Sequence, residues 1–463
     1  MKRLKKILKI LLVISLLWST VSIVSYFYWE NQNENSQKRT SIKQEQQVFT
    51  KEEVITDLRE YKEKLESVHP NPYHTITEKE FDQLMENEIA RLTDEIDRKE
   101  LFLVLSRLSH SLMDEHVTVD FPEEFKTKMI KANTKVLPLK VEIINNRIFI
   151  QTDLTHQIPQ SSELISLNGT LSEKLAEKVL NLKSGRSEKQ IAAYSSDSFS
   201  ELTYMLYGSS SSNKIQYKTN GETKTIDVEG MDYEDYLEEK ALINAYTISD
   251  DGKTAFFTFD EFDDIHTENK LEDTIDQLFS DIKQQGTANL IIDMRNNLGG
   301  NSKYGDQLLK YISDKDFSQM TSSVMKVSDT SRQEIMNYIP AFIRWMHLQY
   351  VIPMLRPLYT QELGSTFTID FDMISPYPKS ERFNGDVTLL ISERTMSSAS
   401  LFAGTFRELQ IGAIEGTATG GYPEHYGNVS SIYLSESGMA VQMPTSINYG
   451  VGGSQPVMPN QND

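Results

Sequence analysis

A cluster of serines lies between an apolar run and a helical pattern in the last quarter of the chain. The segment ERTMSSASLFAG contains Ser397, Ser398 and Ser400 and follows the strand-like run DVTLLIS. In alternating strand–helix folds, active groups gather at the carboxyl ends of strands, where helix N–H groups point outward. A serine there can attack a carbonyl carbon, and free N–H groups of the turn can hold the resulting oxyanion. Because serine is also a favoured N-cap, the cluster alone more often marks an ordinary helix start.

A glycine-containing turn follows an earlier apolar run. In LIIDMRNNLGGNS, Gly299 and Gly300 come shortly after Asp293 and Arg295. Adjacent glycines let the backbone turn tightly and approach a ligand closely, so an N–H of this turn is a candidate second oxyanion donor. The alternative is a plain strand-to-helix turn. In either case we expect Asp293 and Arg295 to form a structural ion pair.

A nucleophilic serine needs a base, and the chain offers eight histidines. His116, in SLMDEHVTVDFP, lies at a predicted helix-to-strand junction beside Asp114 and Glu115, and His425 follows the serine segment in GGYPEH. By residue type alone, any one of them is more often solvent-facing than catalytic. The chain has no cysteine, which excludes disulfides, thiolate catalysis and cysteine zinc sites.

The elements that must position these residues differ along the chain. Residues 49–130 have helical periodicity, beginning with a predicted capping box of Thr50 and Glu53. Residues 131–240 read as short strands and loops, with a hairpin predicted at Asn145-Asn146.

Residues 241–463 alternate strand and helix, which predicts a βα core with a largely parallel sheet. Within this region, Met336–Thr360 is an aromatic-rich insertion. Its sequence is equally consistent with a core or packing helix and with a lid or wall of a substrate site.

The N-terminus predicts the location of the protein. Residues 1–29 combine a basic tip with the uncharged run Ile10–Trp29, which is about long enough to cross a membrane. We therefore expect a single-pass anchor with the rest of the chain outside the cytoplasm, and a cleaved signal is the alternative. Residues 30–48 are polar and read as a stalk. The net charge of −20 argues against a nucleic-acid partner.

Together these pieces resemble the S41 serine peptidases, which include the C-terminal-processing and tricorn-type proteases. The resemblance is carried by IIDMRNNLGG, by LLISERTMSSASLFAG with IGAIEGTATGG, and by LSHSLMDEHVTVDFP. It implies an α/β fold: a helical N-terminal domain, a small β-rich and PDZ-like region, and a ClpP- or crotonase-like catalytic core. It also implies a serine-type peptidase that acts on peptides or unfolded proteins without cofactor or metal.

Residue roles follow from the resemblance. It implies Ser397 as nucleophile, with the N–H groups of Ser398 and Gly299 as the oxyanion hole. Where one branch of the family has a lysine base this chain has Tyr422, and no lysine follows Lys379. The histidine branch therefore remains, with His116 as the base. Such a base implies loss of reactivity as the pH falls through about 6.5.

One part of the family pattern is missing. The histidine branch supplies an orienting glutamate near the C-terminus, where this chain has GGSQPVMPN with no acid. Glu115, Asp114 and Glu424 are candidate substitutes, as is a polar group such as Gln455.

The sequence thus predicts a membrane-anchored, outward-facing serine endopeptidase. The competing hypothesis is a surface binding protein that kept the fold and lost full activity. An acyl-CoA enzyme of the crotonase type ranks last, because export would separate it from its substrate.

Overall fold

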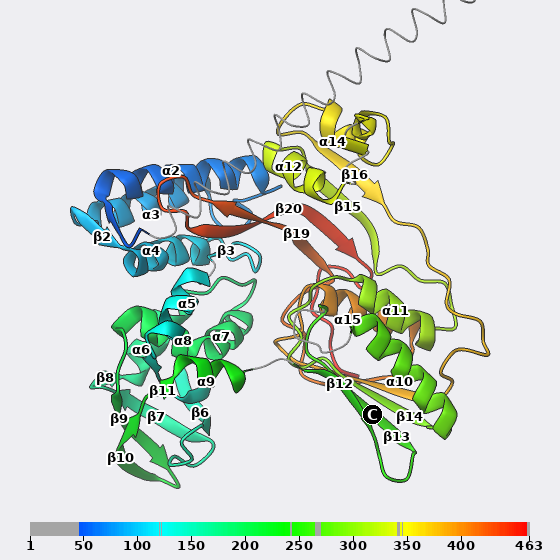
Figure 1. Ribbon diagram of the computed structural model, residues 1–463, viewed down its shortest axis with the longest axis horizontal. Coiled ribbons are helices and arrows are strands. Elements are labelled where there is room, and N and C mark those ends of the chain that lie inside the picture. The colour runs from blue at the N-terminus through cyan, green and yellow to red at the C-terminus, as the bar shows by residue number, and fades with distance from the viewer. Residues whose placement is uncertain are drawn as a thin grey trace, which may run out of the picture.

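The computed structural model describes residues 46–119, 121, 123–240, 243–263, 270–339, 343–344 and 346–460. Three parts of the chain, one helical, one β-rich and one a strand–helix core, pack around a common centre (Figure 1). The predicted anchor Ile10–Trp29 lies outside the described residues. Among the residues that are described, no helix combines the length and the apolar character that crossing a membrane requires.

The N-terminal part is helical, as its periodicity predicts. The predicted capping box is confirmed, because the Thr50 hydroxyl accepts from the Glu53 N–H and the Glu53 carboxylate accepts from the Thr50 N–H. A second capping box joins Thr77 and Glu80 at the next helix. The elements are β1 (Val48–Thr50), α2 (Lys51–Val68), α3 (Glu78–Arg91), β2 (Glu95–Asp97), α4 (Arg98–Ser111), β3 (Thr118–Val119) and α5 (Glu123–Lys131).

The second part is a sheet of order β10-β9-β7-β6-β5, with helices packed on it. The hairpin predicted at Asn145-Asn146 is confirmed, and both asparagines have positive φ, which asparagine tolerates well. The elements are β4 (Lys135–Val136), β5 (Leu139–Ile144), β6 (Arg147–Asp153), β7 (Ser162–Leu167), β8 (Thr170–Leu171), α6 (Ser172–Leu180), α7 (Glu188–Asp197), α8 (Phe199–Tyr207), β9 (Ser212–Thr219), β10 (Glu222–Glu229), β11 (Met231–Asp232) and α9 (Tyr233–Glu238).

The third part contains the predicted parallel sheet, of order β12-β13-β14-β17-β18, in which β12 is the antiparallel edge strand. A second, antiparallel sheet of order β16-β15-β20-β19 was not predicted. The elements are β12 (Asn244–Ile248), β13 (Thr254–Phe259), α10 (Leu271–Gln285), β14 (Asn289–Asp293), α11 (Lys303–Ile312), β15 (Met320–Lys326), α12 (Asp329–Tyr338), η1 (Leu348–Tyr350), α14 (Arg356–Thr360), β16 (Thr366–Asp370), β17 (Asp386–Ile391), α15 (Ser398–Leu409), β18 (Ala413–Gly416), β19 (Glu424–Tyr433) and β20 (Ala440–Gly450).

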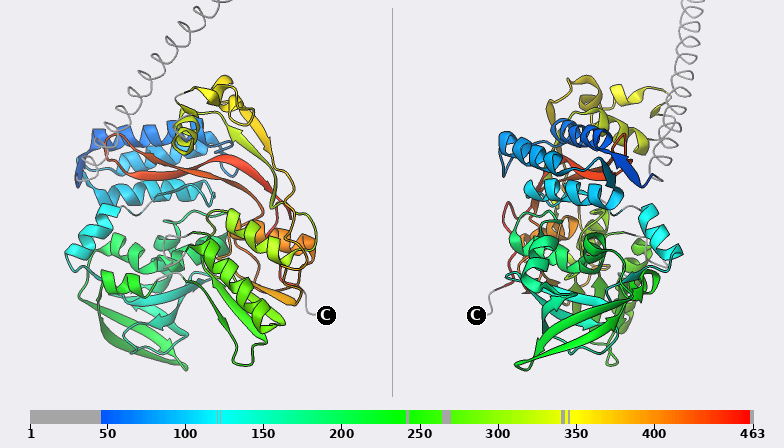
Figure 2. Two further views of the ribbon diagram at one scale, coloured as in Figure 1. Left: turned by 45° about the vertical axis from the view of Figure 1, so that its right-hand side comes forward. Right: turned by 90° about the vertical axis from the view of Figure 1, so that its left-hand side faces the viewer.

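The long β19–β20 hairpin ties the first and third parts together. Figures 1 and 2 show, from different sides, that it extends from the strand–helix core to the N-terminal helices. Its strand β20 pairs with β3 through Val441 and Val119. At its turn, the buried Asp57 of α2 accepts the N–H groups of Glu436 and Ser437.

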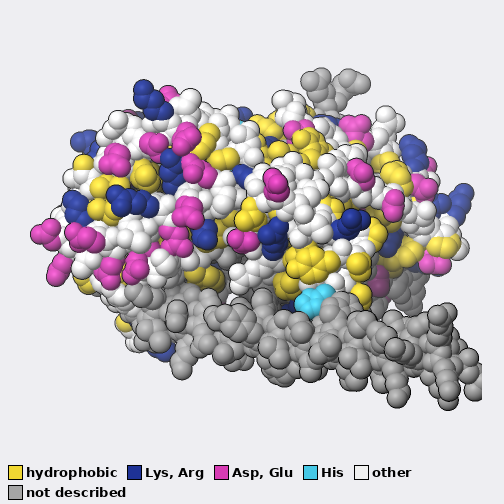
Figure 3. Space-filling model, turned by 90° about the horizontal axis from the view of Figure 1, so that it is seen from above, with side chains coloured by type: hydrophobic (Ala, Val, Ile, Leu, Met, Phe, Trp, Pro, Cys, Tyr) yellow, Lys and Arg dark blue, Asp and Glu magenta, His cyan; other side chains and the backbone are white. Residues whose placement is uncertain are grey.

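Two large hydrophobic cores follow from this arrangement. The first is continuous through the helical and β-rich parts and includes the hairpin residues Ile432 and Met443. It therefore runs across residue 130, where the sequence predicts a domain boundary. The second fills the space around the parallel sheet, between α10, α11 and α15. The face seen from above carries acidic and basic side chains interspersed (Figure 3).

Candidate active site

Ser397 lies at the sharp turn between β17 and α15. Its backbone has φ 50° and ψ −124°, which a non-glycine residue rarely adopts and which costs about 1–3 kcal/mol. Strained residues of this kind cluster at functional sites, and a strained turn before a helix exposes a nucleophile. The Ser397 side chain is partly exposed, and among the described residues none forms a hydrogen bond with its hydroxyl.

The neighbouring serines have other roles. The Ser398 hydroxyl donates to the Gly300 carbonyl at 2.6 Å, and the Ser400 hydroxyl donates to the Thr395 carbonyl at 3.1 Å. Both side chains are buried. The geometry therefore leaves Ser397 as the serine of the cluster whose hydroxyl is available for chemistry.

The glycine turn packs directly on this serine. A Cβ atom on Gly299 would lie 2.7 Å from the Ser397 Cβ and 3.0 Å from the Ser398 nitrogen. Ser398 is the first residue of α15, where an N–H has no acceptor within the helix. Its N–H and the Gly299 turn therefore flank Ser397, as an oxyanion hole for the predicted nucleophile requires.

The Gly299 N–H differs from the expectation in one respect. It donates to the Asn297 side-chain oxygen at 2.8 Å, so it must leave that acceptor before it can bind an oxyanion. Asn297 also accepts the Met396 N–H through its carbonyl and donates to the Phe259 carbonyl through its amide. This buried asparagine, which the sequence analysis did not single out, fixes both sides of the predicted oxyanion hole.

Asp293 and Arg295 form an ion pair at 2.5 Å, as expected. The pair is partly exposed and lies at the end of β14. It stabilises the turn that leads to the glycines and has no further contact with the serine cluster among the described residues.

His116 lies in the turn between α4 and β3. Its main-chain N–H donates to the Asp114 carboxylate at 2.8 Å. The centroid of its ring lies 5.5 Å from that of His425 in β19. No hydrogen bond joins the His116 ring to the Ser397 hydroxyl in this conformation of the described residues. Burial lowers the pKa of His116 to about 4, against the opposing effect of the Asp114 carboxylate, and Arg186 lowers it further.

Side chains of the β-rich part connect the two halves of the site. From α7, Gln190 donates to the Glu115 carboxylate at 2.8 Å and to the Tyr194 hydroxyl at 2.9 Å. The Tyr194 hydroxyl in turn contacts the sulfur of Met396, the residue before the nucleophile. Residues of α7 thus contact both Glu115, which precedes the predicted base, and Met396, which precedes the predicted nucleophile.

The candidate orienting acids occupy different places. Glu115 is buried, with one carboxylate oxygen 3.8 Å from His116 Nδ1. Asp114 is buried against the backbone of His116 and the ring of His69. The Glu424 carboxylate makes no hydrogen bond or ion pair with His116 among the described residues, and Gln455 is exposed.

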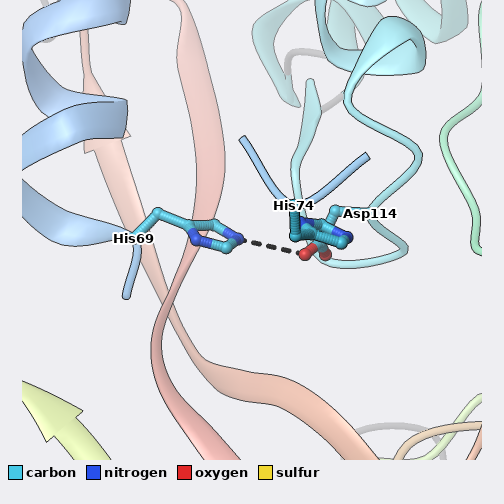
Figure 4. Close-up of side chains that lie close together, drawn as sticks. All are labelled: His69, His74 and Asp114. Carbon is cyan, nitrogen blue, oxygen red and sulfur yellow. Dashed lines mark hydrogen bonds and ion pairs between the residues drawn. The ribbon is translucent and has the colours of Figure 1, made fainter. Parts of the chain in front are cut away.

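His69, His74 and Asp114 form a group with the composition of a metal site (Figure 4). One ligand atom of each lies within 4.8 Å of the others. However, the Asn71 N–H donates to His69 Nδ1, so the proton of the neutral ring is on Nε2, which donates to Asp114 at 3.0 Å. To bind a metal, His69 Nε2 would need a free lone pair, which the protonated nitrogen does not have. We therefore interpret His69 and Asp114 as a hydrogen-bonded pair that supports the His116 turn.

The comparisons with known proteins agree with this geometry. Residues 253–455 match the sequence model of peptidase family S41. Among curated proteins, none matches the chain. The structure of a serine-to-alanine mutant of CPAF is similar with a TM-score of 0.65 at 13% identity, covering 88% of this chain and 92% of that one. CPAF complexed with lactacystin has a TM-score of 0.62 at 14% identity, with coverage of 88% and 93%.

A third solved structure, the photosystem II D1 C-terminal processing protease, has a TM-score of 0.44 at 13% identity, covering 88% of this chain and 92% of that one. At such identities the structural likeness concerns the fold, and the family assignment rests on the sequence match and on the motifs inside it. That match contains the glycine turn and the serine cluster. Residues 253–455 therefore form a peptidase family S41 region, and the chain is a serine-type peptidase.

Proposed function

We propose that the chain is a membrane-anchored endopeptidase that acts outside the cytoplasm, with Ser397 as nucleophile and His116 as base. One observation carries the proposal. Ser397 has a strained backbone at a helix N-terminus and packs on Gly299, while the hydroxyls of Ser398 and Ser400 are bound elsewhere. The anchor rests on the uncharged run Ile10–Trp29 and its basic flank.

In the proposed reaction, the Ser397 hydroxyl attacks the carbonyl carbon of a peptide bond, and its proton passes to His116. The negative charge that develops on the carbonyl oxygen is held by the Ser398 N–H and by the Gly299 N–H once it leaves Asn297. His116 then returns the proton to the leaving amine, which breaks the C–N bond. Water activated by the same histidine hydrolyses the acyl-enzyme and restores Ser397.

Peptides or unfolded proteins are the proposed substrates. One segment of the β-rich part supports this proposal, because the strand and helix of residues 161–180 resemble in sequence the second half of a PDZ module, which binds peptides by strand addition. Helix α7 of the β-rich part lies beside the proposed base through Gln190 and Glu115. A substrate held by this part would therefore lie close to the nucleophile.

Covalent labelling tests the nucleophile. The chain from Val48 onward should react with a fluorophosphonate at about pH 8, where a histidine base is neutral. Labelling should disappear in Ser397→Ala and persist in Ser398→Ala and Ser400→Ala, with mass spectrometry locating the adduct. An adduct on Ser398 or Ser400 would overturn the assignment.

A surface binding protein with impaired catalysis is the second candidate function. Two observations favour it: the Gly299 N–H already has an acceptor, and the His116 ring has no hydrogen bond to Ser397. A folded sample that forms no adduct at Ser397 would favour this alternative.

Membrane fractionation tests the proposed location. Carbonate-washed membranes should retain the full-length protein, and protease added from outside should digest it. Recovery of the protein in the medium, with a new N-terminus near Ser25, would show instead that the N-terminal segment is a cleaved signal.

A further inference from the structure

A cluster of polar side chains surrounds the predicted base. With His116 it contains Glu115 of the same turn, Arg186 just before α7, Gln190 of α7 and His425 of β19, and of these Glu115, Gln190 and His425 are buried. The family resemblance leaves the orienting partner of the base open, because the C-terminal segment that should supply a glutamate has none. The polar side chains of this cluster are therefore the candidates for the partner that orients His116.

Two side-chain atoms of this cluster lack the hydrogen bond that buried polar atoms normally have. Glu115 Oε1 and His116 Nδ1 are both buried, and neither has a hydrogen-bond partner among the described residues. They face each other at 3.8 Å. This distance exceeds a hydrogen bond by roughly 0.6 Å, a gap that a small rotation of either side chain closes. Because buried unsatisfied polar atoms are rare and costly, each atom is the natural partner of the other.

The other candidates are engaged elsewhere. Asp114 uses one oxygen for the His116 N–H and the other for the His69 ring, so it supports the turn rather than the imidazole. His425 directs its Nδ1 to the carbonyls of Tyr422 and Pro423. The Glu424 carboxylate makes no hydrogen bond or ion pair with His116 among the described residues, and only the main-chain carbonyl of Glu424 contacts Arg186.

The second oxygen of Glu115 is fixed from the β-rich part. Gln190 donates to Glu115 Oε2 at 2.8 Å, and the Arg186 guanidinium lies 3.9 Å from Oε1. Arg186 is itself held over the Tyr422 ring. Burial raises the pKa of Glu115, and the Asp114 carboxylate adds to this effect, whereas Arg186 and the Gln190 amide oppose it. These contacts hold the free oxygen of Glu115 next to His116 Nδ1, where it can accept the Nδ1–H.

We propose that Glu115 is the positioning acid of the His116 base and that Gln190 and Arg186 hold it in place. The inference rests on the proposed function of Ser397 and His116. During attack, the Ser397 proton moves to His116 Nε2 while the Nδ1–H stays on the ring. Glu115 accepts that N–H as a carboxylate, fixes the tautomer and stabilises the imidazolium without being protonated.

The test compares the loss of the Glu115 carboxylate with the loss of a second glutamate carboxylate, that of Glu424. Glu115→Gln should lower the rate of fluorophosphonate labelling at Ser397, and kcat on a cleaved peptide, on the order of 1,000-fold. KM should stay within a few-fold, because Glu115 touches the base and not the substrate. Glu115→Asp should recover part of the loss. The control Glu424→Gln removes a nearby carboxylate that does not contact His116 and should stay within a few-fold of the wild type.

A second variant covers a failure of Glu115→Gln to fold, which circular dichroism would reveal. Gln190→Met leaves Glu115 in place but removes the amide on Oε2, and it should slow labelling on the order of tenfold. If the wild type is labelled while folded Glu115→Gln, or else Gln190→Met, reacts at the same rate, the inference is wrong and the proposed function stands. If the wild type is not labelled at all, the proposed function itself fails.

Discussion

Gly299 packs against Ser397 so closely that it has no room for a side chain. Gly299 has φ +102°, a conformation that favours glycine, and its Cα faces the Ser397 Cβ. The sequence predicts Gly299 as a donor of the oxyanion hole. The structure adds a steric role for the same residue, because the missing side chain is what lets the turn approach the nucleophile.

Gly299→Ala should therefore abolish labelling of Ser397. The new Cβ would lie 2.7 Å from the Ser397 Cβ, so the turn or the nucleophile must move, on top of the cost of the positive φ. Gly364→Ala is the matched control, because Gly364 also has a positive φ but has open space where its Cβ would be. Labelling of Gly364→Ala at the wild-type rate, with none in Gly299→Ala, is the expected result. Equal labelling of the two would show that the contact is unimportant.

The base is the second residue-scale assignment. His116→Ala should lower kcat on the order of 1,000-fold, because it removes the proposed acceptor of the Ser397 proton. Tyr422→Phe should stay within a few-fold, since the Tyr422 ring serves as a platform for Arg186 and keeps that role without its hydroxyl. Peptidase assays on both variants provide the measurement. A larger loss in Tyr422→Phe would show that the tyrosine, not His116, acts where other members of the family have lysine.

Several helix starts and turns could be predicted from residues that are close together in the sequence. The capping box of α2, the Asn145-Asn146 hairpin and the turn into α15 each depend on residues close together in sequence, so their patterns could be read directly. The β19–β20 hairpin could not. Its turn is fixed by Asp57, which is more than 370 residues away in sequence, and no local motif records such a contact.

The hairpin contact gives a prediction about stability. Asp57→Ala removes the acceptor of two main-chain N–H groups at a buried position, which should destabilise this contact by about 2–4 kcal/mol. Urea unfolding followed by circular dichroism should show an earlier transition. Asp251→Ala is the control, because Asp251 also caps a turn but is exposed, and it should shift the transition little. Equal shifts would show that the hairpin is held mainly by its apolar residues.

At the scale of the whole molecule, the site exists only where three parts of the chain meet. The proposed nucleophile Ser397 comes from the strand–helix core, the proposed base His116 from the end of the helical part, and Gln190 and Tyr194 from the β-rich part. The sequence identified the serine, the glycine turn and the histidine by their motifs. Arg186, Gln190 and Tyr194 have no motif and become functional only through packing, so sequence alone could not find them.

This convergence has a consequence for pH dependence. A solvent-exposed histidine base would lose half its activity near pH 6.5. His116 is enclosed by Asp114 and Glu115 of its own turn, by His69, by Arg186 and by His425, and burial lowers its pKa to about 4. Since the neutral imidazole is the active form, the labelling rate should stay level from about pH 8 to about pH 5 and fall only near pH 4.

The same shift also predicts how acid affects the fold, and the two effects must be separated. His116 and His425 both have a pKa of about 4 in the folded chain, so between pH 4 and about 6.5 the unfolded chain binds more protons. Stability therefore falls as the pH drops through this window. Labelling in brief incubations, with the fold followed by circular dichroism and reversibility checked by return to pH 8, distinguishes protonation of the base from unfolding. A reversible midpoint near pH 6.5 in folded protein would show that water reaches His116, and that the three parts do not enclose the base.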